Sequence, residues 1–575
     1  MPFRAPVADI AFALKHGAGF TSDALGADDI DAILTEAGRF ASDVIAPLNA
    51  AGDKHGTPFK DGRITMPPGW KEAYQAWAQA GWNAVSAPEA SGGQALPHAI
   101  NAACIEMWNS ASMAFGIGPV LTMGAVEALN AYGSDALKKA YLPKLTSGEW
   151  MGTMQLTEPQ AGTDVGALRT KAERASDGTY RITGQKIFIT YGEHELTDNI
   201  IHFVLARLPD APPGNKGISL FLVPKFLLKA DGSPGQRNDV RAHSIEHKLG
   251  IHASPTCTMV YGDQGGAIGY LVGEENRGLA CMFTMMNLAR LSVGLQGVGI
   301  AERATQQAVE YARDRKQGRS AIIAYPDVKR MLLTMRALTR AARNICYATA
   351  AAIDRSHHGS EAERKAADER AALLTPIAKA FSTDIGIEVA SLGIQVHGGM
   401  GFIEETGAAQ HLRDARIAAI YEGTNGIQAL DLVGRKIAMS NGAAVRGYIA
   451  ELRKTVDQVN ASNDPAFGFT GTRLAETLDS LERATAWLLG KLEKEPQAAQ
   501  AGATPYLRLF GNAAGGCMLA SEALAALRLS EGDPASRIAI ARFFAENVAV
   551  QADGLERSII EGADSVNSAD AALGV

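Results

Sequence analysis

The chain has 575 residues, of which 46% are hydrophobic, 20% are charged and 6% are aromatic. These proportions are those of a globular protein with roughly three to four structural units, and they exclude collagen-like, coiled-coil and wholly disordered chains. Lys and Arg number 55 against 62 Asp and Glu, so the net charge of -7 offers no basic excess for nucleic acid.

The sequence carries no recognisable targeting or membrane-spanning signal. Arg4, Asp9 and Lys15 interrupt the apolar residues at the start, unlike a secretory signal, and no run approaches about 20 consecutive apolar residues. The five cysteines are far apart and form no Cys-x-x-Cys pair, which suits a reducing compartment. We expect a cytoplasmic protein without a transmembrane segment, although a helix lying on a membrane surface would resemble a core-facing helix in sequence.

Helical periodicity dominates residues 1–150. Between Ile30 and Ile45 apolar residues recur every three or four positions, and Pro47 ends the pattern. Alanine-rich stretches of the same kind follow at 70–80, 100–109 and 121–131. We therefore expect an N-terminal helical domain.

Residues 151–275 have the pattern of a β-domain. Short apolar runs at 180–190, 200–206 and 218–223 alternate with clusters of Gly, Pro and Asp. The absence of helices between them argues against a doubly wound nucleotide-binding fold.

Long helical patterns return at 285–315, 327–355 and 361–395, which predicts a helical bundle over 276–440. Residues 441–575 are again helical in pattern, with turn-rich interruptions at 461–472 and 496–505. The expected fold class is therefore α+β and multidomain: a helical N-terminal domain, a middle β-barrel-like domain, a C-terminal four-helix bundle and an extra C-terminal helical domain.

Several common catalytic motifs are absent. The sequence has no phosphate loop, no Gly-x-Ser-x-Gly elbow and no His-Glu-x-x-His helix, and the glycines at 294, 297 and 299 suit helix packing better than dinucleotide binding. His243, His247 and His252 lack a regular ligand spacing, so we expect no metal site.

Two segments are candidates for chemistry. Thr157–Asp164 follows a strand-like run, and its hydroxyls, glycine and free amides allow close approach to a phosphate or a polar ring edge. An ordinary turn between strands would have the same composition.

The second segment, 417–428, places Glu422 after an apolar run and before two glycines. Apolar surroundings raise a carboxyl pKa and make the carboxylate a better base near neutral pH, so Glu422 is a candidate general base. A helix-start glutamate, or one paired with Arg413 or Arg416, remains an alternative.

Five ordered segments together carry a resemblance to a known family. They are 156–164, 184–190, 315–317, 395–402 and 420–424. In this order they resemble the acyl-CoA dehydrogenase family of flavoproteins, and the similarity covers residues 30–440.

The resemblance implies that FAD is held between the β-domain and the bundle and reaches into a neighbouring subunit. It implies cofactor contacts for Met154, Leu156, Thr157, Phe188, Thr190 and Thr424, and contacts with the partner subunit's FAD for Arg315, Gln395 and Gly399. It also implies that the acyl-CoA substrate is bound by Thr163, Asn287, Arg290 and Gly423.

In such enzymes the residue matching Glu422 removes the α-proton of an acyl thioester while a hydride leaves the β-carbon for the flavin. The main-chain N–H of Glu422 would polarise the thioester carbonyl. Some relatives place the base near Asn287–Arg290, where this chain has no carboxylate.

The chain also departs from the family pattern. Asn287, Phe188 and Gly426 stand where many relatives have Asp, Trp and Gln, and residues 316–319 lack the usual aromatic. A basic residue expected after the glutamate helix is matched loosely by Arg435.

The segments 3–10, 193–200 and 247–257, with the C-terminal extension, resemble the bacterial branch that includes 3-methylmercaptopropionyl-CoA dehydrogenase. This implies 3-(methylthio)propanoyl-CoA or another short or medium acyl-CoA as substrate, electron-transfer flavoprotein as acceptor, and a homo-oligomer, with a dimer favoured.

Three alternatives stay open at the sequence level. A medium- or long-chain fatty acyl-CoA dehydrogenase could use the extension at a membrane surface. An oxidase would differ mainly in flavin access. A DNA-associated protective flavoprotein would need a basic stripe in the tail, but residues 446–570 interleave acids and bases.

Overall fold

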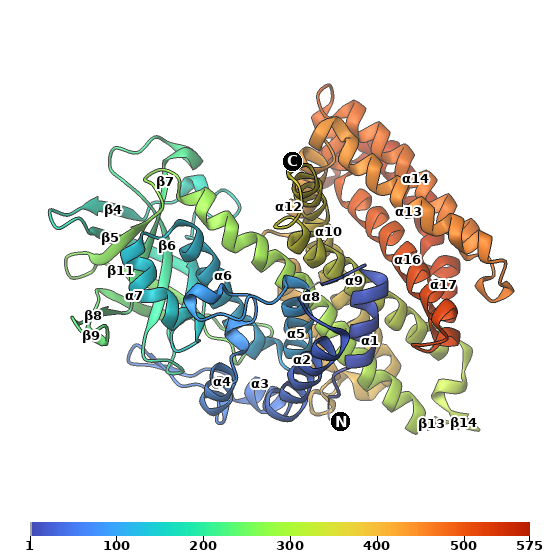
Figure 1. Ribbon diagram of the computed structural model, residues 1–575, viewed down its shortest axis with the longest axis horizontal. Helices are drawn as coiled ribbons and strands as arrows, with labels where there is room; N and C mark the ends of the chain where they lie inside the picture. The colour runs from blue at the N-terminus through green and yellow to red at the C-terminus, as the bar shows by residue number, and fades with distance from the viewer. Residues whose placement is uncertain (1–2, 23, 575) are drawn as a thin grey trace. The chain divides into compact units, whose positions relative to one another are not determined.

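The computed structural model describes residues 3–22 and 24–574, which form two compact units (Figure 1). The first, called the sheet unit, comprises Ser42–Leu96 and Ser112–Ala289. The second, called the helical unit, comprises the described residues up to Ala41, then Pro97–Ala111, and those from Arg290 onward.

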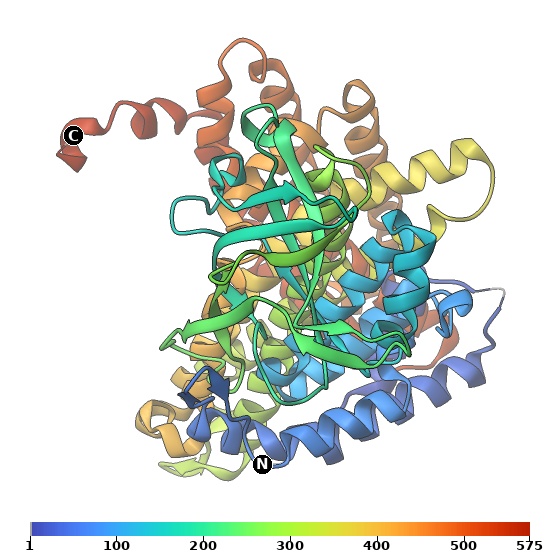
Figure 2. The ribbon, with the colours of Figure 1, turned by 90° about the vertical axis from the view of Figure 1, so that its left-hand side faces the viewer.

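An eight-stranded sheet is the centre of the sheet unit, and its strands can be followed in Figure 2. The strands are β3 (Met151–Gln155), β4 (Lys171–Arg174), β5 (Tyr180–Thr190), β6 (Ile200–Arg207), β7 (Ile218–Pro224), β10 (Val240–Ile245), β11 (Thr256–Tyr261) and β12 (Ala267–Val272). Their order is β10-β11-β5-β12-β7-β6-β3. Strand β4 pairs with both β5 and β6, so β4, β5, β12, β7 and β6 close into a ring. The expected β-domain is confirmed, and only short 3-10 turns interrupt its strands.

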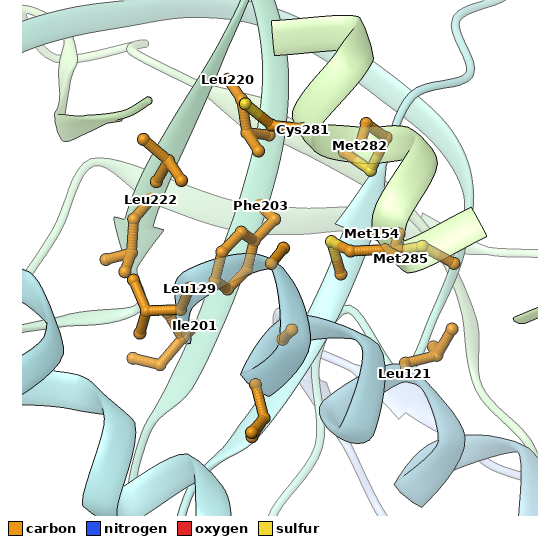
Figure 3. Close-up of a cluster of buried hydrophobic side chains, with 14 of the residues drawn as sticks. Leu121, Leu129, Met154, Ile201, Phe203, Leu220, Leu222, Cys281, Met282 and Met285 are labelled. Atoms are coloured by element: carbon orange, nitrogen blue, oxygen red, sulfur yellow. The ribbon is translucent and has the colours of Figure 1, made fainter. Parts of the chain in front are cut away.

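The helices of this unit are α3 (Asn49–His55), α4 (Trp70–Gln79), α6 (Met113–Tyr132), α7 (Asp135–Thr146) and the beginning of α8 (Gly278–Asp314). Apolar side chains of α6, α7 and α8 form one buried cluster with side chains of the sheet. Helix α6 packs on β3, and Figure 3 shows side chains from α6, the strands and α8 pointing into one cluster around Phe203, which is fully buried. The cluster includes Met154 of β3, and Leu156, which follows that strand, packs against it. Both are candidate site residues.

Within residues 3–22 and 24–574, two helices, α6 and α8, are long and apolar enough to cross a membrane. Of their most apolar windows, 89% and 67% of the residues are buried within the structure. Burial of this kind is typical of core helices, which need apolar residues on all sides.

The helical unit contains the expected bundle and the extension. Its first helices are α1 (Val7–Phe12), α2 (Ala27–Phe40) and α5 (His98–Ala111), followed by α8 from Arg290, α9 (Pro326–Arg355), α10 (Glu361–His397), α11 (Ala408–Ala415) and α12 (Asn425–Asp431). The extension has α13 (Ala443–Ser462), α14 (Thr470–Lys491), α15 (Pro496–Ala501), α16 (Ala503–Leu529), α17 (Pro534–Asn547), α18 (Ala552–Ile560), α19 (Ala563–Asn567) and α20 (Asp570–Leu573).

One turn prediction is wrong. Residues 496–505 are almost entirely helical, because Pro496 and Pro505 both lie in the first turn of a helix, where a missing N–H costs nothing. The predicted interruption at 461–472 is confirmed, since α13 ends at Ser462 and α14 begins at Thr470.

The extension packs tightly against the bundle within the helical unit. Gly511 of α16 lies so close to α10 that a Cβ there would be 2.2 Å from the ring of Phe381. Ion pairs also join the extension to earlier helices: Arg508 of α16 lies 3.1 Å from Glu388 of α10, and Arg537 of α17 lies 2.7 Å from Asp9 of α1. The extension is therefore part of one core with the bundle.

Candidate functional site

Glu422 lies on a short loop between the 3-10 turn Arg416–Ala419 and α12, in the helical unit. Its backbone has a φ of +58°, a left-handed conformation that is uncommon for a residue with a side chain, and Gly423 follows at +85°. The buried amide of Gln428 donates to the Glu422 carbonyl at 3.1 Å, and the Thr424 hydroxyl caps α12. These two hydrogen bonds help to keep the Glu422 backbone in its strained left-handed conformation.

The Glu422 carboxylate is half-buried and has no hydrogen bond to any residue that the structure describes. Burial raises its pKa, while the charges of Arg290 and Lys379 act in the opposite direction without cancelling the rise. A raised pKa and a free pair of oxygens are the properties of a general base. The alternative, an ion pair between Glu422 and Arg413 or Arg416, does not form: Arg413 instead bonds Glu404 at 2.8 Å.

Arg290 is 8% exposed and lies 3.9 Å from Asp431, which also accepts from Arg435 at 2.6 Å. Burial lowers the Arg290 pKa, and the carboxylates of Asp431 and Glu422 raise it. The structure therefore brings three of the predicted site residues together with Arg290: Glu422, Gly423 and Thr424.

The sequence did not predict a role at this site for Lys379, Asn425 or Gln428. Lys379 of α10 donates to the Gly423 carbonyl and to the Asn425 side chain, both at 2.8 Å. Gln428 donates to the Glu422 carbonyl. A lysine inside the apolar run 376–381 is the signal that could have pointed to the first of them.

A second group of predicted residues gathers on the sheet unit. The N–H of Ile187 donates to the Thr157 carbonyl at 2.9 Å, which places the end of β3 beside the Phe188–Thr190 end of β5. Phe188 has a φ of +59° and a side chain that is 59% exposed. Leu156 and Thr157 are partly buried there, and Met154 is buried below them in the cluster of Figure 3.

Glu158 and Lys186 fix this arrangement from beneath. Lys186 is fully buried and donates to Glu158 at 2.8 Å and to the Leu156 carbonyl at 3.0 Å. Burial alone would raise the Glu158 pKa, but Lys186 and the hydrogen bonds from Thr170 and the Arg169 N–H lower it to about 2. The Thr157–Asp164 segment is thus a tight turn, as the alternative proposed, and its glutamate anchors the turn to β5.

A third group lies at two helix ends of the helical unit. The ring of Tyr311 on α8 stacks on His397 at the end of α10, with 4.3 Å between centroids. Arg315 follows one turn after Tyr311, and Gln395 and Gly399 flank His397, all three exposed. Thr163 and Asn287 are exposed on other segments, and no described hydrogen bond joins their side chains to these groups.

The residues present fit FAD. A strand that holds an aromatic ring in solvent beside hydroxyls and a backbone edge suits a flat ring with polar edges. The exposed Arg315 guanidinium suits a diphosphate, and Gly399, two residues after His397, has no atom within 4 Å of where its Cβ would be. Among residues 3–22 and 24–574, no three His, Cys, Asp or Glu side chains cluster as a metal site would require.

Comparison with known domain families gives a consistent identity along the chain. Sequence models of the acyl-CoA dehydrogenase N-terminal, middle and C-terminal domains match residues 27–149, 153–263 and 276–437. A fourth model, described as acetyl-CoA dehydrogenase C-terminal like, matches residues 448–570 of the extension.

Whole-chain relatives agree with these matches. The chain is 46% identical to 3-methylmercaptopropionyl-CoA dehydrogenase of Ruegeria pomeroyi, over 99% of this chain and 100% of that one. It is 35% identical to a butyryl-CoA dehydrogenase of Syntrophomonas wolfei, over 94% of each. The crystal structure of an acyl-CoA dehydrogenase from Bacillus anthracis complexed with FAD shares the fold, with a TM-score of 0.77 and 21% identity over 96% of this chain and 92% of that one. The chain therefore belongs to the acyl-CoA dehydrogenase family of FAD-dependent oxidoreductases.

Proposed function

We propose that this enzyme converts an acyl-CoA thioester to its trans-2-enoyl-CoA product with Glu422 as the general base. The observation that carries the assignment is the half-buried Glu422 carboxylate, which lacks a hydrogen-bond partner among the described residues and has a raised pKa. No acid stands in the alternative position near Asn287–Arg290.

The cofactor, the Glu422 carboxylate and the Glu422 main-chain N–H have separate roles in this reaction. FAD, when bound, supplies the acceptor for the hydride that leaves the β-carbon. Glu422 accepts the α-proton, and its raised pKa makes it a stronger base. The Glu422 main-chain N–H donates to no described residue, so it is free to polarise the thioester oxygen as negative charge develops there.

Glu422→Gln tests this assignment, because the amide keeps the shape of the side chain and cannot take the proton. We expect turnover of acyl-CoA with an artificial electron acceptor to fall by about 10²- to 10⁴-fold, with FAD content unchanged. Glu493→Gln, at an exposed glutamate of the extension, is the matched control and should keep full activity. Turnover that survives Glu422→Gln would exclude this residue as the base.

For the substrate we propose 3-(methylthio)propanoyl-CoA or another short or medium acyl-CoA, on the strength of the 46% identical relative. One methylene in an apolar pocket discriminates by only about 1–3 kcal/mol, so longer linear chains are the second candidate. Anaerobic flavin bleaching with acyl-CoAs of increasing length, including the methylthio compound, distinguishes them by the chain length that reduces the flavin fastest.

The remaining assignments follow from the family. We propose FAD contacts for the Phe188 group and for Thr424, contacts to a partner subunit's FAD for the Arg315 group, and CoA contacts for Thr163 and Asn287. We also propose a cytoplasmic homodimer that passes electrons to electron-transfer flavoprotein, with domains at 1–150, 151–275, 276–440 and 441–575.

No observation favours the DNA-associated alternative. Basic side chains of the extension pair with acids of neighbouring helices, as Arg453 does with Asp479 at 2.9 Å and Arg483 with Glu556 at 2.6 Å. Such pairs leave little free positive charge for phosphates.

A further inference from the structure

Lys379 is a lysine with no solvent exposure, in the middle of α10. Lysine is almost never fully buried unless its ammonium is paired, because removing that charge from water is costly. Two hydrogen bonds compensate here: Nζ donates to the Gly423 carbonyl and to Asn425 Oδ1, both at 2.8 Å. Both acceptors lie within three residues of Glu422.

Asn425 continues the connection to α10. Its Nδ2 donates to Asp384 Oδ1 at 2.7 Å and to Thr383 Oγ1 at 2.9 Å. One asparagine is therefore held by a lysine on one side and by a carboxylate and a hydroxyl on the other. The first turn of α12 is fastened to α10 directly after the Glu422 loop.

The bond to Gly423 acts on the strained part of that loop. The left-handed backbone at Glu422 is unfavourable for a residue with a side chain and persists only where its surroundings fix it. Lys379 fixes the carbonyl that follows, and Gln428 fixes the carbonyl of Glu422 itself at 3.1 Å. Without the lysine, the loop could relax and change the direction of the carboxylate.

Lys379 also acts through charge. The groups that face it are Glu422 and Asp384, which raise its pKa, and Arg290, which lowers it; burial is the largest effect and brings the pKa to about 7. In turn, Lys379 lowers the pKa of Glu422 against the effect of burial. Each charge therefore favours the ionised form of the other group.

We propose that Lys379 is the positioning residue for the general base: it holds the Glu422 loop in its left-handed conformation and aims the carboxylate. The inference rests on the proposed role of Glu422. Lys379 contacts the loop and is not itself assigned any contact with substrate.

Lys379→Met removes both hydrogen bonds and the charge while keeping an unbranched side chain that is one atom shorter. In the holoenzyme we expect kcat to fall about 10- to 100-fold, because small displacements of a reacting group have effects of this size. KM and FAD content should change little. The kinetic isotope effect with α-deuterated acyl-CoA should rise, because proton removal becomes rate-limiting, and the pH profile of kcat should change shape.

Ser382→Ala is the matched control, since it deletes another buried polar group of α10 that faces Cys346 of α9, at 3.4 Å. It should leave the isotope effect and the pH profile unchanged. Lys379→Arg, which keeps a charged donor, should recover part of kcat.

The outcomes separate the two claims. A Lys379→Met enzyme with kcat within twofold of wild type, or one that loses kcat and FAD together with an unchanged isotope effect, would overturn the positioning role. If that variant does not fold, Asn425→Ala takes its place: a raised isotope effect supports the proposal and an unchanged one refutes it. Activity in Glu422→Gln would instead refute the role of Glu422.

Discussion

Arg537 provides a direct measure of how strongly the C-terminal extension is joined to the rest of the helical unit. Its guanidinium is 4% exposed, bonds Glu522, lies 2.7 Å from Asp9, and is 3.9 Å from the centre of the Phe12 ring. Arg537→Met keeps most of the side-chain volume but leaves Glu522, 2% exposed, with the Asn344 amide as its one hydrogen-bond partner among the described residues.

The expected cost is about 3–5 kcal/mol of unfolding free energy, because breaking one partner of a buried ion pair strands the other charge. Burial already raises the Glu522 pKa, with Arg537 the main opposing charge, so the variant should take up a proton at Glu522 on folding. Asp9 retains Arg340 at 2.8 Å, so its loss is partial. Urea unfolding followed by circular dichroism measures the change.

Two further variants test the reasoning behind this magnitude. Arg542→Met removes an exposed arginine of the same helix, paired with Glu546 at 2.9 Å, and should cost less than about 1 kcal/mol. Adding Glu522→Leu to Arg537→Met removes both charges and should restore most of the stability. An Arg537→Met protein within about 1 kcal/mol of the Arg542→Met protein would refute the buried-pair argument.

Two further predictions concern packing and pH. Gly511→Ala should destabilise the protein by about 1–3 kcal/mol because its Cβ would collide with Phe381, whereas Gly447→Ala, with no atom within 4 Å of its Cβ, should gain about 0.5–1 kcal/mol; equal urea midpoints would contradict this. Burial lowers the pKa of His202 to about 3, so between pH 6.5 and pH 3 the unfolded chain binds a proton that the folded chain does not. Stability should fall by about 1.4 kcal/mol per pH unit from this group as pH decreases, and His202→Gln should remove that slope in urea unfolding at pH 7.5 and pH 5.

The sequence predicted elements better than it predicted their partners. Apolar periodicity is a local signal, so it located the long helices and the strands, and the setting of Glu422 among apolar residues and glycines revealed a candidate base. It could not show that α5, in the first 150 residues, belongs with the helical unit, where its buried Glu106 bonds Arg343 at 2.6 Å across 237 positions. Lys379 was missed for the same reason, since its acceptors lie 44 and 46 positions away.

The bond between Asp9 and Arg537 spans 528 positions. At about 5–20 residues per second, a ribosome needs roughly half a minute to two minutes to make the second residue after the first. All segments of the sheet unit, by contrast, have been made once Ala289 is added. During synthesis the sheet unit can fold first, whereas the ion pair of Asp9 with Arg537 can form only after α17 has been made. Until then Asp9 has Arg340 as a partner but lacks the ion pair that joins α1 to α17.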